Sequence, residues 1–200
     1  MSKTLEFIFD FGSPNAYMVA KTLPPILQRT GASLRITPCL LGGIFKATGN
    51  QGPMMAYGGI KGKLEYEQLE MKRFIQKHGL TDFQFNSHFP VNTLMLMRGA
   101  IVAQEQGRLD DYIKAGLKAM WEDSQKMDDP DVYAKVMTQA GFDGQQLLEQ
   151  MQQPEIKAKL AENTQSAVDR GAFGIPTFFV GEEMFFGKDR LQQVEEALLS

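Results

Sequence analysis

The chain has 200 residues, the length of one ordinary domain or of a small domain that carries a large insertion. Hydrophobic residues make up 43% of it and charged residues 22%, which is enough apolar surface for a folded core. The formal net charge is −3 and lysines and arginines form no cluster, so neither DNA nor RNA is expected as a partner.

The single cysteine, Cys39, limits the chemistry further. One thiol cannot form an internal disulfide, which argues against a secreted, disulfide-stapled framework. The N-terminal residues lead into a strand pattern without an apolar stretch of signal-peptide length, and the longest apolar runs are much shorter than a membrane span. We therefore expect a cytoplasmic protein without a membrane partner, in which Cys39 is an inert core thiol.

The first elements form a strand, a helix and a second strand. Apolar residues alternate over Leu5–Phe11, which predicts a well-buried strand. Ser13-Pro14 follows, with serine at a helix N-cap position and proline in the first turn. The helix should end near Gly31, and Pro24-Pro25 should kink or interrupt it. Ser33–Thr37 predicts the second strand, and a connection of this length makes the two strands parallel.

The segment after the second strand, residues 41–53, is rich in glycine and is expected to be a loop. From about residue 61 to residue 166 the periodicity is helical, and no convincing strand pattern occurs. Gly79, Gly107 and Gly141 stand where helices should stop. The expected helices span residues 64–78, 93–106, 110–123, 130–140, 144–151 and 154–167.

The last part of the chain returns to strands. Thr177–Val180 and Met184–Phe186 predict a hairpin, and Asp189–Leu199 predicts a final helix with Asp189 as its cap. A strand pair at either end would be unstable alone, so we expect one four-stranded sheet built from both ends. The resulting fold class is α/β, a thioredoxin-like fold (βαβ … ββα) with a large all-helical insertion. Residues 1–60 and 167–200 would form the thioredoxin-like domain, and residues 61–166 the inserted helical domain.

Ser13 is the first candidate for chemistry. The loop after the first strand delivers it to the carboxyl end of the sheet and to a helix N-terminus, where unpaired N–H groups favour an anion such as a thiolate. A free thiol has a pKa of about 8.5, so a hydroxyl that donates to it would help to ionise it near neutrality. Taken alone, however, Ser13-Pro14 is more often only a helix cap.

Two further segments could bind a ligand at the same edge of the sheet. Pro176 opens a strand, and a cis peptide there would expose the backbone of Ile175 to a bound peptide, for which glutathione has the right length. Asp189 and Arg190 could hold the charged groups of a γ-glutamyl moiety. A trans proline that starts a strand explains Pro176 at least as well. Taken alone, an N-cap aspartate beside a solvated arginine explains Asp189-Arg190 better.

Lys46, Asn50 and Lys61 are candidates for the substrate side of the cleft, where they could meet a carboxylate. Most lysines are only solvated surface, and the glycine-rich segment lacks the phosphate-binding patterns. No metal site is expected, because His78, His88 and Cys39 stand at no metal-ligand spacing. The nucleophile elbow of serine hydrolases, Gly-x-Ser-x-Gly, is also absent.

Taken in order, these segments resemble the 2-hydroxychromene-2-carboxylate isomerase family, relatives of the kappa-class glutathione transferases within the DsbA-like thioredoxin superfamily. The resemblance covers nearly the whole chain. It rests on residues 9–14, 46–50, 89–94 with Arg98, 119–122, 140–143, 170–177 and 186–191. Residues 13–16 are Ser-Pro-Asn-Ala, where DsbA relatives have Cys-x-x-Cys, so dithiol–disulfide exchange cannot occur here.

The resemblance implies a glutathione-dependent isomerase of 2-hydroxychromene-2-carboxylate-like aromatic catabolites, or a closely related glutathione transferase. Glutathione would be the cofactor, the substrate a small electrophile or aromatic carboxylate, and the protein a homodimer. A non-catalytic thioredoxin-fold module that binds a peptide or small molecule is the alternative. The implied roles are catalysis by Ser13, glutathione binding by Ser13, Ile175, Pro176, Gly187, Lys188, Asp189 and Arg190, and substrate binding by Lys46, Asn50 and Lys61.

Overall fold

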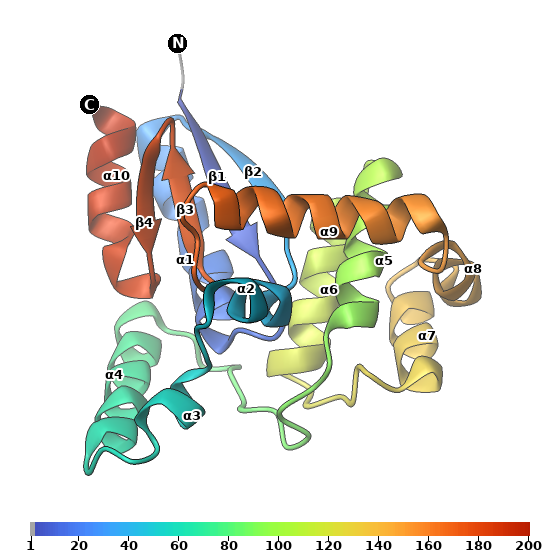
Figure 1. Ribbon diagram of the computed structural model, residues 1–200, viewed down its shortest axis with the longest axis horizontal. Coiled ribbons are helices and arrows are strands. Elements are labelled where there is room, and N and C mark those ends of the chain that lie inside the picture. Colours follow the sequence, from blue (N-terminus) through green and yellow to red (C-terminus); the bar gives the residue numbers. More distant parts are fainter. Residues whose placement is uncertain (1–2) are drawn as a thin grey trace.

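A four-stranded sheet joins the two ends of the chain in the computed structural model, which describes residues 3–200 (Figure 1). The strand order is β2-β1-β3-β4. β1 pairs in parallel with β2 and antiparallel with β3, and β3 and β4 form an antiparallel hairpin. The strands are β1 (Thr4–Phe9), β2 (Ser33–Pro38), β3 (Thr177–Val180) and β4 (Glu183–Phe186).

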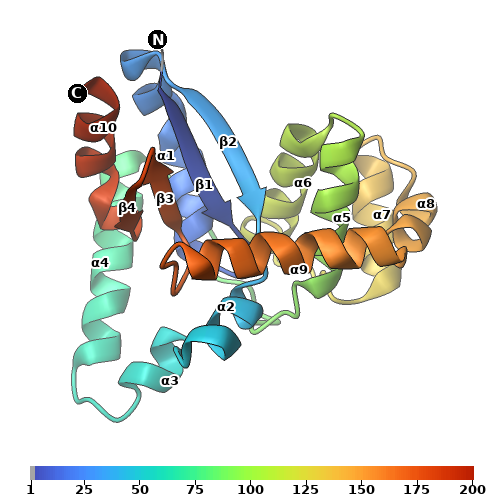
Figure 2. The same cartoon turned by 45° about the horizontal axis from the view of Figure 1, so that its top comes forward.

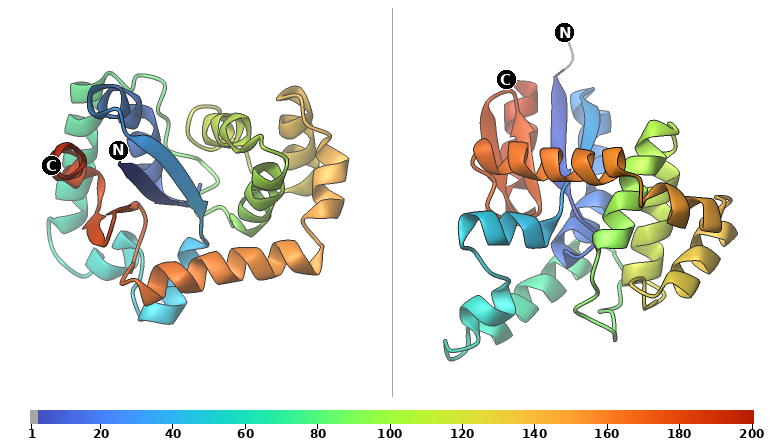
Figure 3. Two further views of the ribbon diagram at one scale, coloured as in Figure 1. Left: turned by 90° about the horizontal axis from the view of Figure 1, so that it is seen from above. Right: turned by 45° about the vertical axis from the view of Figure 1, so that its right-hand side comes forward.

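The remaining chain is largely helical, and the helices lie in two groups. α1 and α10 pack together on one face of the sheet, whereas α9 crosses the other face and connects it to the helices α5 to α8 (Figures 2 and 3). The helices are α1 (Pro14–Thr30), α2 (Leu41–Thr48), α3 (Pro53–Tyr57), α4 (Lys63–His78), α5 (Leu94–Glu105), α6 (Leu109–Trp121), α7 (Pro130–Gln139), α8 (Gly144–Gln150), α9 (Pro154–Asp169) and α10 (Leu191–Leu199), with a 3₁₀ turn η1 (Lys188–Arg190) before the last.

The expected fold class is confirmed, and the helices predicted after residue 61 agree with the observed ones to within two residues at each end. β1 is the central strand, and every residue from Leu5 to Phe9 is buried, as a strand covered on both faces should be. The division into two domains at residues 61 and 166 stays a prediction.

Two features of the backbone differ from the expectation. Of the kink or interruption expected at Pro24-Pro25, the structure excludes the interruption, because α1 is continuous from Pro14 to Thr30. Both prolines lie on the exposed face of the helix, where water can bond the carbonyls that lose an N–H partner. Their buried neighbours Leu23 and Ile26 keep the helix packed on the core.

The glycine-rich segment is also not a loop, because it contains α2 and α3. α2 packs against α9, and a Cβ at Gly43 would lie only 3.0 Å from the side chain of Thr164. This glycine therefore allows two helices to approach closely. The predicted cap of the final helix is wrong as well: η1 precedes α10, and the Asp189 carboxylate lies 3.2 Å from the Lys188 ammonium instead of capping α10.

A glycine in α6, Gly116, allows this helix to approach the residues that follow β1. Phe11, just beyond β1, is fully buried, and the Trp121 indole N–H donates a 2.8 Å hydrogen bond to its carbonyl. A Cβ on Gly116 of α6 would collide with the Phe11 ring. Gly116 thus lets the helical part of the chain contact the turn that follows β1.

We expect Gly116→Ala to lower the free energy of unfolding by about 2 kcal/mol, because the added methyl overpacks the contact with Phe11. Urea denaturation monitored by circular dichroism measures this loss. Gly42→Ala is the matched control, since among residues 3–200 no atom lies within 4 Å of a Cβ there, and alanine should leave α2 unchanged or more stable. Equal unfolding midpoints for Gly116→Ala and the wild type would contradict the expectation.

Candidate active site

Ser13 lies where β1 gives way to α1. Its backbone is extended, with φ −99° and ψ 114°, and its Oγ accepts a 3.2 Å hydrogen bond from the Ala16 N–H, so Ser13 caps α1. The same hydroxyl donates a 3.0 Å hydrogen bond to the Ile175 carbonyl. Ser13 is 4% exposed. The structure therefore brings together two predicted site residues that are 162 positions apart.

The peptide bond between Ile175 and Pro176 is cis. The Pro176 carbonyl accepts a 2.9 Å hydrogen bond from the Gly187 N–H, which links the cis peptide to the segment before α10. Within residues 3–200 the Ile175 N–H donates to no protein acceptor, although the residue is only 6% exposed. A buried donor without a partner is costly in a protein, so this N–H is suited to a ligand carbonyl.

The Gly187–Arg190 segment places its charged residues differently. Lys188 is 6% exposed, and its ammonium lies 5.6 Å above the ring of Phe74 on α4 as well as beside Asp189. Asp189 and Arg190 are exposed. Lys188 therefore anchors the segment against α4, and the two following residues remain accessible to a ligand.

The three residues predicted for the substrate side separate in the structure. Asn50 donates a 2.7 Å hydrogen bond from Nδ2 to the Phe173 carbonyl, which places it two residues from Ile175. Lys46 is exposed on α2. The connection between α3 and α4, which contains Lys61, lies at the outer end of an arm that extends from the sheet (Figure 2). Only Asn50 is bonded to the segment around the cis peptide.

Sequence reasoning missed Asp10, which is fully buried at the carboxyl end of β1. Its Oδ1 accepts a 2.8 Å hydrogen bond from the Gly12 N–H, and its Oδ2 accepts a 2.7 Å bond from the Leu41 N–H. Burial raises the pKa of the Asp10 carboxyl, while the bonds from Leu41, Gly12 and Thr93 oppose that rise. An aspartate two residues before a glycine is typical of such a side-chain turn, and this was the available signal.

Cys39 lies close to this buried carboxylate and is fully buried. Burial, and then the negative charges of Asp10 and Glu6, raise the pKa of the Cys39 thiol far above its ordinary value. Its Sγ donates to the Asn163 carbonyl at 3.4 Å. A thiol in this environment is not ionised near neutrality and does not act as a nucleophile.

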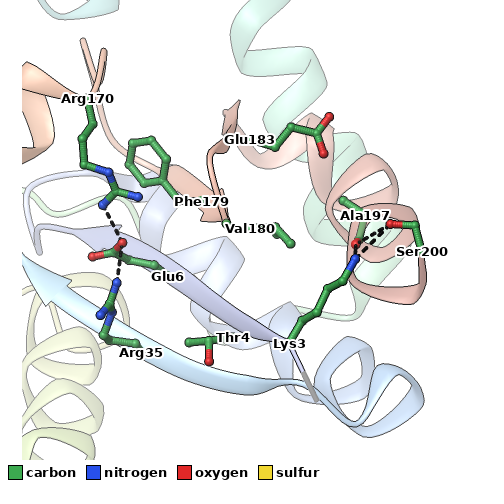
Figure 4. A pocket seen from close by; sticks show the side chains of 11 residues that line it. Lys3, Thr4, Glu6, Arg35, Arg170, Phe179, Val180, Glu183, Ala197 and Ser200 are labelled. Atoms are coloured by element: carbon green, nitrogen blue, oxygen red, sulfur yellow. Dashed lines mark hydrogen bonds and ion pairs between the residues drawn. The ribbon is translucent and has the colours of Figure 1, made fainter. Parts of the chain in front are cut away.

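A hollow of about 520 Å³ lies toward the other end of the strands and contains none of the predicted site residues (Figure 4). Its floor is Glu6 on β1, whose carboxylate accepts hydrogen bonds from Thr37 (2.6 Å), Arg35 (2.8 Å) and Arg170 (2.6 Å). The Arg170 guanidinium also stacks 3.6 Å from the ring centre of Phe179. These contacts use the charges of the hollow to hold the sheet and α9 together.

The described residues provide neither a metal-binding cluster nor a membrane-spanning helix. Across residues 3–200, no group of three His, Cys, Asp or Glu side chains is arranged to hold a metal ion. No helix in the same part of the chain is both long and apolar enough to cross a membrane.

One protein-family model matches nearly the whole chain. Residues 4–199 match the model of the DSBA-like thioredoxin domain. The chain belongs to the DsbA-like thioredoxin family. Residues 13–16 of the chain, Ser-Pro-Asn-Ala, contain no cysteine.

Its relatives within the family are enzymes of two kinds. The chain is 27% identical to a 2-hydroxychromene-2-carboxylate isomerase of Pseudomonas putida over 194 residues, which cover 97% of the chain and 93% of the relative. It is 26% identical to human glutathione S-transferase kappa 1 over 216 residues, covering 99% and 92%. These similarities confirm the resemblance expected from the motifs.

A solved structure of 2-hydroxychromene-2-carboxylate isomerase matches the fold with a TM-score of 0.83 and 27% identity, covering 98% of the chain and 94% of that structure. A probable DsbA oxidoreductase from Streptomyces coelicolor matches with a TM-score of 0.77 at 16% identity, and covers 98% and 88%. The second likeness shows the fold alone.

The ion cluster around Glu6 gives a pH-dependent prediction. Burial would raise the pKa of Glu6, but the hydrogen bonds from Thr37, Arg170 and Arg35 together lower it below its ordinary value. A carboxyl whose pKa is lower in the folded state stabilises the fold at higher pH, and it loses this contribution as the pH falls through the folded-state pKa.

Glu6→Gln should therefore lower the free energy of unfolding by about 2 kcal/mol above about pH 5, because the neutral amide loses the ion pairs with Arg35 and Arg170. The difference from the wild type should shrink as the pH is lowered further. Denaturation curves at a series of pH values measure it. A difference that grows toward acid pH would contradict the assigned direction.

Proposed function

We propose that this DsbA-like protein is a glutathione-dependent isomerase acting on 2-hydroxychromene-2-carboxylate-like aromatic catabolites, or a closely related kappa-type glutathione transferase. Its full-length relatives of both kinds support this type of enzyme. The observation that carries the proposal is the 3.0 Å hydrogen bond between the Ser13 hydroxyl and the Ile175 carbonyl at a cis proline. It places an alcohol, a helix N-terminus and the unpaired Ile175 N–H at one point.

The residues present fit a bound glutathione. The unpaired Ile175 N–H and the Ile175 carbonyl offer one donor and one acceptor to the cysteine of a tripeptide, as an added strand requires. Asp189 and Arg190 offer opposite charges for the γ-glutamyl ammonium and carboxylate. Gly187 and Pro176 support this edge through their own 2.9 Å hydrogen bond, and Lys188 through its contact with Asp189.

Ser13 acts through its hydroxyl proton. When a peptide N–H occupies the Ile175 carbonyl, the Ser13 O–H is released from that acceptor and can turn to a sulfur anion. The hydroxyl and the N-terminus of α1 then both favour the thiolate over the thiol. Glutathione held by Ile175, Asp189 and Arg190 would supply a sulfur nucleophile for reversible addition to a conjugated substrate. Lys46, Asn50 and Lys61 bind the substrate carboxylate in this proposal.

The finer setting is also proposed. The enzyme acts in the cytoplasm, where glutathione is abundant and a lone thiol such as Cys39 stays reduced. It forms a homodimer with a second copy through the arm of α3 and α4. This arm exposes several large apolar side chains, a pattern typical of an interaction surface. They are Met54, Met55, Ile60, Tyr66 and Leu69.

Ser13→Ala should reduce kcat/KM by about 100-fold, because the donor that stabilises the thiolate is lost, while the Kd for glutathione changes by no more than about threefold. Turnover is measured with 2-hydroxychromene-2-carboxylate and with an activated aryl halide, and binding by titration calorimetry. Asp143→Ala is the matched control. It removes the N-cap of α8, which accepts from the Gln146 N–H at 2.9 Å, and should leave both measurements unchanged.

The outcomes separate the candidate functions. Equal kcat/KM for Ser13→Ala and the wild type would show that Ser13 is only a helix cap. Tight glutathione binding without turnover of either electrophile would favour a non-catalytic binding module. Absence of glutathione binding at millimolar concentration would overturn the proposed function.

A further inference from the structure

The most deeply buried charge near the candidate site is the carboxylate of Asp10. We propose that Asp10 is a positioning residue: it fixes the Ser13 turn to the first turn of α2, and so aligns the Ser13 hydroxyl with the sulfur of bound glutathione. This inference rests on the proposed function. It assigns no contact between Asp10 and either ligand.

The carboxylate joins the turn after β1 to the start of α2, beside the 3.0 Å bond from the Cys39 N–H to the Phe9 carbonyl. Its Oδ1 holds the Gly12 N–H inside the turn, and the Ser13 N–H donates to the Asp10 main-chain carbonyl at 3.3 Å. Its Oδ2 holds the N–H of Leu41, the first residue of α2. The N-cap residue of α2 is Leu40, whose side chain cannot accept a hydrogen bond. The Asp10 carboxylate accepts from the first N–H of α2 instead, and so caps this helix.

The turn is also confined on its third side. A Cβ at Gly12 would lie 3.3 Å from Cγ2 of Thr93 and 3.4 Å from Oδ1 of Asp10. Thr93 immediately precedes α5, and its side chain is a further hydrogen-bond partner of the carboxylate. The position of the turn is therefore set by three elements that meet at one buried group.

These bonds form a closed chain of contacts that returns to Asp10. α2 leads to Asn50, which donates to the Phe173 carbonyl, and the chain from Phe173 reaches Ile175, which accepts from Ser13. Ser13 is connected back to α2 through Asp10. A change at Asp10 should thus alter the relation of Ser13 to Ile175, although Asp10 contacts neither side chain of that pair.

An amide cannot replace the carboxylate in this role. Both oxygens of Asp10 accept from backbone N–H groups, whereas asparagine has one acceptor oxygen and one NH₂ donor. In either orientation, the NH₂ of Asp10→Asn would face a backbone N–H, of Gly12 or of Leu41. One side of the connection would be lost, with little change in side-chain volume.

The charge of Asp10 and its positioning of Ser13 shift the pKa of a nearby thiol in opposite directions, so the direction of the measured shift distinguishes the two effects. A negative charge disfavours a neighbouring thiolate, so removing the charge alone would lower the pKa of the bound thiol. Losing the alignment of Ser13 would raise it. Cys39 is a titratable group close to Asp10, and its thiol is neutral.

The experiment compares Asp10→Asn with Glu6→Gln, the same change at another buried carboxylate of the same strand, in which the hydrogen bonds lie in the hollow of Figure 4. The pKa of glutathione bound to each folded variant is read from the ultraviolet absorbance of the thiolate. We expect Asp10→Asn to raise this pKa by about one unit and to lower kcat/KM by about 10- to 100-fold. Glu6→Gln should change neither.

A second variant keeps the test informative if Asp10→Asn folds poorly. Leu41→Pro removes the α2 donor at the first helical position, where proline is well tolerated, and replaces the partly buried leucine side chain by a smaller apolar one. It should shift the thiol pKa in the same direction by a smaller amount. In the variant that combines Asp10→Asn with Leu41→Pro, the asparagine NH₂ can face the proline, which has no N–H to repel it. The value of kcat/KM should therefore recover relative to Asp10→Asn alone.

A lowered or unchanged thiol pKa in Asp10→Asn would overturn the proposal, as would a double variant as impaired as the two single changes combined. A measurement without glutathione separates this result from failure of the proposed function. Amide hydrogen exchange at Gly12 or Leu41 should become faster in Asp10→Asn than in Glu6→Gln. Unchanged exchange at both amides would also overturn the proposal, whether or not the protein binds glutathione.

Discussion

The burial of β1 between β2 and β3 is the constraint on which the candidate site depends. A central strand with both faces covered has a fixed position, so whatever follows its carboxyl end is fixed as well. Ser13 follows it directly, and the antiparallel neighbour β3 begins beside it, after the cis Ile175-Pro176 bond. The hydrogen bond between Ser13 and Ile175 is a consequence of this pairing. The candidate site therefore lies at the end of two buried, paired strands.

Much of the fold was predictable because it depends on local patterns. Period-two alternation marked β1, and the glycines at helix ends marked the stops of α4, α5 and α7. The errors arose where tertiary packing overrides local preference. Pro24 and Pro25 are tolerated because their side of α1 faces solvent, and Gly43 supports helix packing instead of a loop because Thr164 lies against it. Neither fact can be read from residues adjacent in sequence.

The site shows the same limit. Ser13 was recognisable from its cap position and Pro176 from its place at the start of a strand, and both lie where the patterns predicted. Asp10 was missed because its main partner, Leu41, is 31 residues away and offers only a backbone N–H, which leaves no mark in the sequence. For the same reason, the burial of Lys188 against Phe74 could not be foreseen.

The pairing of Leu5 with Val180 has a consequence for biosynthesis. A ribosome releases the first strand long before the third, so the nascent chain cannot complete its sheet until residues 177–186 have been synthesised. Meanwhile the edge of β1 that β3 will occupy stays open to other chains, and such edges promote aggregation. The helices made in between can form early from local contacts. Chaperones that shield nascent chains should thus matter more for this protein than its modest size suggests.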